Sequence, residues 1–199
     1  MDKLGIYIPT FNRENELKEC LKSFIPQVKK YNLPIYISDN STTHDTEKLV
    51  RMMKAKYYNR IYYRKNKYIR LGRTYALNLR SVFEMGNTEY VWFFGDDDKI
   101  APGAIKEVLS CIKKGYSFIQ INATGFDREL KYVKIPRQIK KYRNVKYDKY
   151  SYKKVMQNAN ANNALGYVGH MASIITKREL IAKEIKKIDF NSPYLDFIH

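Results

Sequence analysis

Three consecutive carboxylates, Asp96, Asp97 and Asp98, stand directly after an apolar run at residues 90–94. Adjacent carboxylates repel one another, and at the end of a buried segment this repulsion is costly unless a cation neutralises it. Their hard oxygen atoms suit Mg²⁺ or Mn²⁺, and these ions also bind phosphate groups. The triplet therefore indicates a divalent metal site. A solvated acidic turn before a helix, where Asp favours the helix dipole, is the alternative.

Asp39 occupies a comparable place, after a second apolar run and before the polar residues 40–42. A carboxylate there could accept a hydrogen bond from the ring N–H of uracil or a similar base. The alternative is an Asx-turn, or a helix cap made by Thr43 or Asp45. Phe11 could stack on the base, although a single aromatic residue after a strand more often belongs to the core.

A third pattern, Gly72-Arg73 followed by Ala76 and Asn78, lies at the start of a helical segment. Glycine permits close approach of the backbone to a ligand, and an arginine at a helix N-terminus can meet a pyrophosphate. An ordinary junction between a loop and a helix explains the same residues equally well.

These polar groups need elements to position them, and strand and helix patterns alternate through the first half of the chain. The apolar runs predict strands at 4–8, 34–38, 61–63, 90–94, 117–121 and 167–175. The spacing of apolar residues predicts helices near 17–28, 45–56, 75–86, 102–115 and 177–187. Pro9 should close the first strand, Pro26 should kink or end the first helix, and Pro102 suits the first turn of the fourth.

This order predicts an α/β fold with a mainly parallel sheet. Ligands bind such sheets beyond the carboxyl ends of the strands. The polar clusters after the first, second and fourth strands should therefore meet at one edge. The length of 199 residues suffices for one domain, which we divide into a half at 1–122 and a second half at 123–199.

The charge is strongly positive, because 37 Lys and Arg residues face 20 Asp and Glu residues, giving +17. Such a field attracts nucleic acid, anionic lipid surfaces or phosphorylated substrates, and a Lys-rich genome would produce the same excess. Residues 131–154 hold ten basic residues, five tyrosines and one acid, Asp148. Tyrosine and lysine suit an interfacial belt, so we expect this stretch to face an anionic acceptor or a membrane surface, peripherally and in a salt-sensitive manner.

Targeting features are sparse. No run of about 18 uncharged apolar residues could span a membrane, and the residues after Met1 do not form a signal peptide. Cys20 and Cys111 are the only cysteines, and both are expected to be buried thiols. Cytoplasmic residence is the expectation, with peripheral attachment at the inner face of a membrane as its extension.

Four motifs in order together resemble the family 2 glycosyltransferases of GT-A fold. The matching segments span residues 4–105 and are Ile8-Pro9-Thr10-Phe11-Asn12-Arg13, Tyr36-Ile37-Ser38-Asp39-Asn40-Ser41, the spaced set Asn66, Gly72, Ala76 and Asn78, and Trp92-Phe93-Phe94-Gly95-Asp96-Asp97-Asp98. The second resembles the family motif whose Asp contacts the base, and the last resembles its Asp-x-Asp segment.

The resemblance implies a Rossmann-like, three-layer fold in which 1–122 binds a nucleotide-diphosphate sugar and 123–199 forms the acceptor side. It implies a divalent metal, Mn²⁺ or Mg²⁺, with Asp98 as the direct ligand and Asp96 assisting it or holding the ribose. The donor-binding residues that it implies are Pro9, Thr10, Phe11, Asn12, Asp39, Asn66, Gly72, Arg73, Asp96 and Asp97.

The implied reaction is a direct inverting displacement by an acceptor hydroxyl on a glycan, protein or lipid-linked acceptor. The general base of the family is an Asp or Glu well after the Asp-x-Asp segment. Asp196 is our preferred candidate, and Asp148 or Asp189 are alternatives. The Gln/Arg-x-x-Arg-Trp motif of processive members is absent, which favours transfer of one sugar.

One departure concerns Leu77, which stands where many members carry an arginine, so Arg73 or Arg80 is expected to contact the phosphates instead. Two other functions compete. A sugar-nucleotide pyrophosphorylase of similar fold would carry a glycine-rich loop after the first strand, and residues 10–15 contain no glycine. A nucleic-acid-binding module would suit the basic, tyrosine-rich stretch, but the acidic triplet would repel a phosphate backbone, so nucleic acid is the weaker alternative.

Overall fold

The computed structural model describes residues 1–67, 74–126, 133–135, 170–188 and 190. These residues group into two compact units, one made of Met1–Ile119 with Ile175–Ile198 and one of Gln120–Ile174 with His199. The second unit contains a small two-stranded sheet, β6 (Gly125–Phe126) with β7 (Val133–Ile135). The single-domain organisation inferred from the sequence stays a prediction.

The main sheet has six strands in the order β3-β2-β1-β4-β8-β5. In that order the strands are β3 (Ile61–Lys65), β2 (Ile35–Asp39), β1 (Leu4–Thr10), β4 (Tyr90–Phe93), β8 (Ile174–Lys177) and β5 (Phe118–Gln120). The first four run parallel to one another, and β8 runs antiparallel to β4. The mainly parallel α/β sheet expected from the sequence is therefore confirmed.

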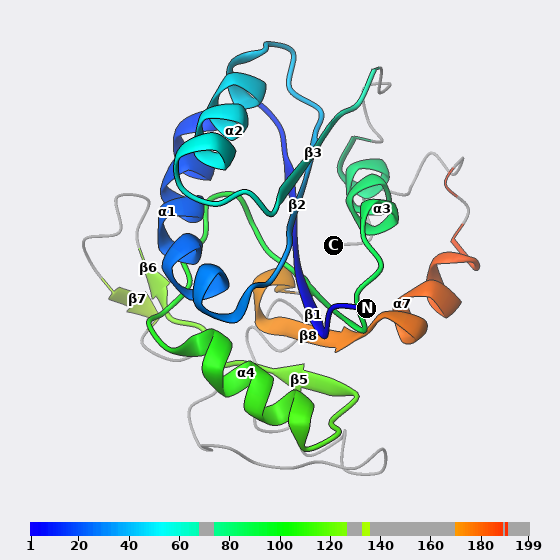
Figure 1. Cartoon of the computed structure of the whole chain (residues 1–199). Coiled ribbons are helices and arrows are strands. Elements are labelled where there is room, and N and C mark those ends of the chain that lie inside the picture. Colours follow the sequence, from blue (N-terminus) through cyan, green and yellow to red (C-terminus); the bar gives the residue numbers. More distant parts are fainter. Residues whose placement is uncertain (68–73, 127–132, 136–169, 189, 191–199) are drawn as a thin grey trace. The chain divides into compact units, whose positions relative to one another are not determined.

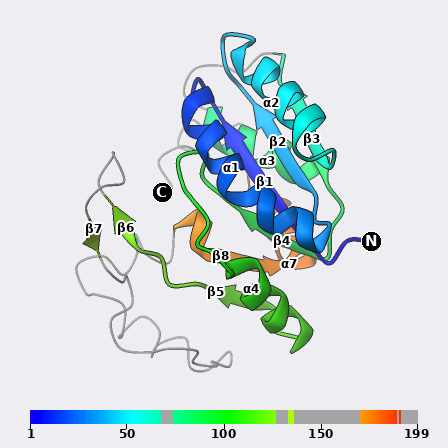
Figure 2. The same ribbon diagram turned by 60° about the vertical axis from the view of Figure 1, so that its left-hand side comes forward.

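Helices cover both faces of the parallel strands, as Figures 1 and 2 show. Their bounds are α1 (Glu14–Tyr31), α2 (Asp45–Lys56), α3 (Thr74–Met85), α4 (Ala104–Lys113) and α7 (Arg178–Ile185), with a short 3₁₀ turn, η1, at Met171–Ser173. Helices α1 and α2 lie together on one face, and α3 lies on the other. This makes three layers. No described helix has the length and apolar character needed to cross a membrane.

The alternation of side chains along the strands builds a core on each face. On the α3 face, Tyr7 and Tyr36 stack with ring centroids 4.8 Å apart and pack with Phe83. On the α1 face, Phe24 meets Trp92 edge to face at 6.2 Å. Strands β1 and β2 are buried along their whole length, which explains why they read as continuous apolar runs in the sequence.

Two prolines lie inside elements, although we expected Pro9 to close its strand and Pro26 to kink or end its helix. Pro9 belongs to β1, whose pairing with β4 reaches only Tyr7, so the missing N–H removes no bond to β4. Pro26 lies inside α1. Because proline has no backbone N–H, the carbonyl of Lys22, four residues earlier, receives no helical hydrogen bond from this position. Both Pro26 and Lys22 are exposed, so water can satisfy that carbonyl while the buried neighbours of the proline hold the helix in place.

Two further boundaries differ from the prediction. Pro102 precedes α4 instead of occupying its first turn, because Gly103 at the N-cap adopts a left-handed conformation with φ of 80°. The strand expected at 167–175 begins only at Ile174, and residues 167–169 are outside the described part. Ser173 donates from both its N–H and its hydroxyl to the carbonyl of His170, at 3.0 and 2.7 Å, which closes a turn instead of extending the strand.

Candidate active site

The carboxyl ends of β1, β2 and β4 are joined by hydrogen bonds that converge on Thr10. The Thr10 hydroxyl donates to Asp96 Oδ2 at 2.7 Å, which links the ends of β1 and β4. The Thr10 carbonyl accepts from the N–H of Asn40 at 3.1 Å and from Asn78 Nδ2 at 3.0 Å. The polar clusters that the sequence placed after these strands therefore meet at one edge of the sheet.

Asp96 is the buried member of the acidic triplet, with 6% of its surface exposed. Arg13 Nη1 donates to Asp96 Oδ1 at 3.3 Å and to Asp97 Oδ2 at 2.8 Å, so one guanidinium nitrogen bridges two carboxylates. Burial raises the pKa of Asp96, and the contacts from Thr10 and Arg13 oppose that rise. The sequence motif contained Arg13, but reasoning from the sequence gave it no role.

Gly95 provides the space into which the other two carboxylates fold. A Cβ on this residue would lie 2.8 Å from Asp98 Oδ2 and 2.9 Å from Asp97 Oδ1, closer than atoms normally approach. Cys20 lies behind the same turn, with its thiol directed at the Gly95 carbonyl at 3.6 Å. Burial and the neighbouring carboxylates raise the pKa of this thiol well above its usual value. Cys20 is therefore the buried thiol that was predicted, whereas Cys111 is only partly buried.

The donor set of the triplet suits a hard cation, but the protein does not enclose one. Among the described residues, no three His, Cys, Asp or Glu side chains are arranged to surround a metal ion. Mg²⁺ in phosphate-binding sites is commonly held by one or two carboxylates, and substrate phosphates and water complete its shell. The guanidinium of Arg13 already stands as a cation against two of the carboxylates. These residues fit a metal that binds together with a diphosphate.

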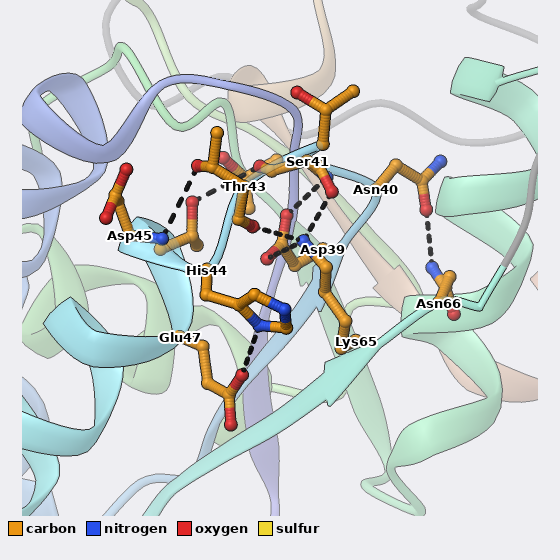
Figure 3. A network of polar contacts seen from close by, with 12 residues as sticks. Asp39, Asn40, Ser41, Thr43, His44, Asp45, Glu47, Lys65 and Asn66 are labelled. Atoms are coloured by element: carbon orange, nitrogen blue, oxygen red, sulfur yellow. Dashed lines mark hydrogen bonds and ion pairs between the residues drawn. The ribbon is translucent and has the colours of Figure 1, made fainter.

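Asp39 lies at the centre of a second network, drawn in Figure 3, and has no exposed surface. Its Oδ1 accepts from the N–H of Ser41 at 2.6 Å, which is an Asx-turn contact. Its Oδ2 accepts from the Tyr63 hydroxyl at 2.6 Å and from Lys65 Nζ at 3.3 Å. Burial and the Asp39 carboxylate raise the pKa of Tyr63.

Lys65 closes the loop over Asp39. Its ammonium also donates to the carbonyl of Ser41 and to that of Thr43, the latter at 2.7 Å. The Asx-turn that we weighed as an alternative is thus present. A base can reach the Asp39 carboxylate only if Lys65 or the surrounding loop gives way, so contact between Asp39 and a base stays a prediction.

Asn66 ties the end of β3 to β2 and α3. Its Nδ2 donates to Asn40 Oδ1 at 2.6 Å and to Ser38 Oγ at 2.8 Å, and its Oδ1 accepts from Ser81 Oγ at 2.9 Å. Its backbone N–H donates to the carbonyl of Asp39 at 2.9 Å. The contacts place Asn66 beside the predicted base pocket as a residue that holds the surrounding loops.

The loop after β1 presents Phe11 to solvent, with 48% of its surface exposed. Asn12 has a left-handed φ of 53°, and its N–H donates to Ser41 Oγ at 2.8 Å. Its Oδ1 accepts from the N–H of Thr42 at 2.9 Å. The core position that we weighed for Phe11 is excluded, and its exposed ring is available to a ligand.

Several predicted site residues lie outside the described residues: Gly72, Arg73, Asp148, Asp189 and Asp196. The basic stretch 131–154 does so too, apart from residues 133–135. Arg80 pairs with Glu84 of its own helix at 2.8 Å, and its guanidinium stacks on the Phe190 ring, so contact of Arg80 with a phosphate stays a prediction. Burial first, and then the carboxylates of Asp96 and Asp97, raise the pKa of Tyr75.

Solved structures of the same fold include TarS and a mannosyltransferase. Residues 1–349 of TarS from S. aureus superpose with a TM-score of 0.71 at 16% identity, over 95% of this chain and 51% of that chain. A mannosyltransferase from Pyrobaculum calidifontis, solved with GDP-Man and Mn²⁺, gives a TM-score of 0.58 at 15% identity, over 92% and 46% of the two chains. These neighbours confirm the GT-A fold.

Two curated relatives have higher sequence identity to this chain, over a shorter matched region. Abequosyltransferase RfbV from Salmonella typhimurium is 37% identical over 104 residues, 51% of this chain and 30% of that protein. The GalNAc(5)-diNAcBac-PP-undecaprenol beta-1,3-glucosyltransferase of Campylobacter jejuni is 31% identical over 119 residues, 60% of this chain and 37% of that protein. The matched regions thus span about a third of each relative.

The family model described as "Glycosyl transferase family 2" matches residues 5–180, which include every described residue of the two polar networks. The acidic triplet, the Asp39 loop and the junction at Thr10 lie at the sheet edge where the family resemblance predicted a donor site. This chain belongs to glycosyl transferase family 2.

Proposed function

We propose that this protein transfers a single sugar from a nucleotide-diphosphate sugar to an acceptor hydroxyl, with inversion and with the help of Mn²⁺ or Mg²⁺. The observation that carries the proposal is the hydrogen bond from Thr10 to Asp96. It joins the strand end beside the predicted base pocket to the strand end that bears the carboxylates. A nucleoside diphosphate, with a base at one end and a charged diphosphate at the other, matches this arrangement.

The donor's parts are assigned by the chemistry of the two networks. The base lies at the Asp39 loop, with Phe11 beside its ring, and the diphosphate lies towards Asp98. TarS was solved with UDP-GlcNAc and the Pyrobaculum enzyme with GDP-Man, so the shared fold accepts different bases and sugars. The fold therefore supports the donor class and leaves the base and the sugar to experiment.

The residues of the triplet have different proposed roles in binding the donor. Asp98 is the direct metal ligand in this proposal, and Asp96 assists it or holds the ribose. In the free protein, Thr10 and Arg13 contact the two oxygens of the Asp96 carboxylate. A divalent metal, when bound, would stabilise the negative charge that grows on the leaving diphosphate. Asp196 is proposed to take the proton from the acceptor hydroxyl, with Asp148 as the alternative.

The acceptor is proposed to be a glycan or a lipid-linked glycan at a membrane surface. The Campylobacter relative is named for an acceptor on PP-undecaprenol, a lipid carrier. The net charge of +17 suits attraction to an anionic inner leaflet. We also propose that attachment is peripheral and on the cytoplasmic side, and that a protein is an alternative acceptor.

The test is a thermal-shift screen of UDP, GDP, CDP, dTDP and ADP, each with Mn²⁺ and with EDTA. At least one diphosphate should raise the Tm in Mn²⁺, because a ligand that binds only the folded state stabilises it, and EDTA should make this shift smaller by removing the metal. The cognate nucleotide sugar should then be consumed with a suitable acceptor. If no nucleotide shifts the Tm in either condition while a single-stranded oligonucleotide does, the nucleic-acid alternative replaces this proposal.

A further inference from the structure

The guanidinium of Arg13 faces two carboxylates of the acidic triplet. Its Nη1 lies 2.8 Å from Asp97 Oδ2 and 3.3 Å from Asp96 Oδ1. The charge of Asp96, followed by that of Asp97, raises the pKa of Arg13, so the group stays a cation under all working conditions. A resident cation thus faces two of the three carboxylates.

The backbone of Arg13 is held, whereas its side chain has room to move. Arg13 precedes α1, and its carbonyl accepts from the N–H of Leu17 at 2.9 Å. The preceding residue, Asn12, is fixed by its bonds to Ser41 and Thr42. The Arg13 side chain itself is 50% exposed, so the guanidinium can turn towards solvent or towards a bound anion without disturbing the helix.

The third carboxylate is arranged differently. Asp98 lies over Gly95, whereas the carboxylates that Arg13 contacts are those of Asp96 and Asp97. The formal charges of these four side chains are three negative and one positive. A dication that approaches this site meets both attraction from the carboxylates and repulsion from the guanidinium.

We propose that Arg13 is a built-in counter-ion that makes metal and nucleotide binding interdependent. In the free protein the guanidinium competes with a metal for Asp96 and Asp97. A nucleoside diphosphate brings negative charge that draws the guanidinium away from these carboxylates, which then become available to the metal. This inference rests on the proposed function, because the diphosphate is the anion that turns Arg13.

The inference predicts changes of opposite sign for two ligands measured separately in Arg13→Gln. Affinity for Mn²⁺ alone should rise by about tenfold, since a unit charge close to a dication is worth on the order of a tenfold change even in a water-like dielectric. Affinity for UDP without metal should fall by roughly threefold or more, because the diphosphate loses a cation and faces uncompensated carboxylates. Mn²⁺ binding can be followed by electron paramagnetic resonance and UDP binding by calorimetry.

The controls separate charge from folding. Arg13→Lys keeps the cation and should stay near the parent for both ligands. Arg51→Gln removes an exposed arginine that pairs with Glu47 on α2, away from the triplet, and should change neither affinity. Loss of folded protein would weaken both ligands together, so opposite signs cannot arise from misfolding. Arg13→Met repeats the test with an apolar side chain should Arg13→Gln fold poorly by circular dichroism.

The inference is overturned if Arg13→Gln binds Mn²⁺ alone no more tightly than the parent, or if it binds UDP alone more tightly. The proposed function has its own failure: no nucleoside diphosphate of the screen binds the parent or any variant, with or without Mn²⁺. In that case the Mn²⁺ comparison between Arg13→Gln and the parent still decides whether Arg13 is the counter-ion of the triplet.

Discussion

At the scale of single residues, the three carboxylates of the triplet have different surroundings. Asp96 is buried against Thr10, Asp97 pairs with Arg13, and Asp98 folds over Gly95. We expect Asp98→Ala to weaken Mn²⁺-dependent nucleotide binding by about tenfold or more, because a direct metal ligand is lost. Its free energy of unfolding should stay the same or rise slightly, since one of three repelling charges is removed.

Calorimetry with and without Mn²⁺ checks the binding, and urea unfolding checks the fold. Glu16→Ala, which removes an exposed carboxylate from the first turn of α1, is the matched control and should leave nucleotide binding unchanged. Full transfer activity in Asp98→Ala would show that the metal assignment is wrong.

Asp39 has a structural role as well as a proposed role in base binding, and the two are separable. Asp39→Asn keeps the size of the side chain but directs an amide at Lys65 Nζ or Tyr63 Oη. We expect nucleotide affinity to fall by about 1–3 kcal/mol and the free energy of unfolding to fall by a similar amount. Tyr63→Phe, which removes one hydrogen bond to Asp39 and no charge, should affect stability more than affinity. Unchanged nucleotide affinity in Asp39→Asn would remove Asp39 from the base pocket.

At the scale of elements, alanine substitutions at Gly86 and Gly95 should differ in their effects on stability and on nucleotide binding. A Cβ on Gly95 would meet the ends of two flexible carboxylate side chains, whereas a Cβ on Gly86 would meet Tyr7 and Tyr36 in the core at 2.5–2.7 Å. Gly86→Ala should therefore cost about 1–3 kcal/mol of stability and spare nucleotide binding. Gly95→Ala should cost under about 1 kcal/mol, because the side chains can turn aside.

In Gly95→Ala, the displaced carboxylates of Asp97 and Asp98 should no longer be placed to bind a metal as in the parent. The Mn²⁺-dependent nucleotide affinity of this variant should therefore fall by about tenfold. Urea unfolding and calorimetry on both variants measure the contrast. Equal binding by Gly95→Ala and the parent would mean that the placement of Asp97 and Asp98 over this glycine is irrelevant to the donor.

At the scale of the whole molecule, the net charge of +17 predicts salt-sensitive attachment to anionic surfaces. We expect the protein to sediment with vesicles containing phosphatidylglycerol at low salt and to be released at about 0.5 M salt, where the Debye length falls to about 4 Å. Neutral phosphatidylcholine vesicles are the control and should not retain it. Indifference to anionic vesicles at low salt would refute the membrane proposal, and tight binding to an oligonucleotide instead would favour the nucleic-acid alternative.

The sequence by itself determined the order and type of the elements and the edge at which the polar groups meet. The helix expected at 45–56 is the observed α2, and the strands of the parallel sheet appear in the expected order within a few residues. These features depend on the spacing of apolar residues along short segments, which is a local property. Because parallel strands end at one edge, the residues after β1, β2 and β4 had to meet there.

Only the tertiary structure decided which groups touch. Arg13 is 84 residues from Asp97 in sequence, and Lys65 is 26 residues from Asp39, so no local pattern could pair them. The persistence of α1 through Pro26 likewise depends on burial of its neighbours in the core, which propensity does not contain. The spacing of residues along short segments thus predicts where the site lies. The hydrogen-bond partners, burial and electrostatics of the site depend on contacts between distant segments.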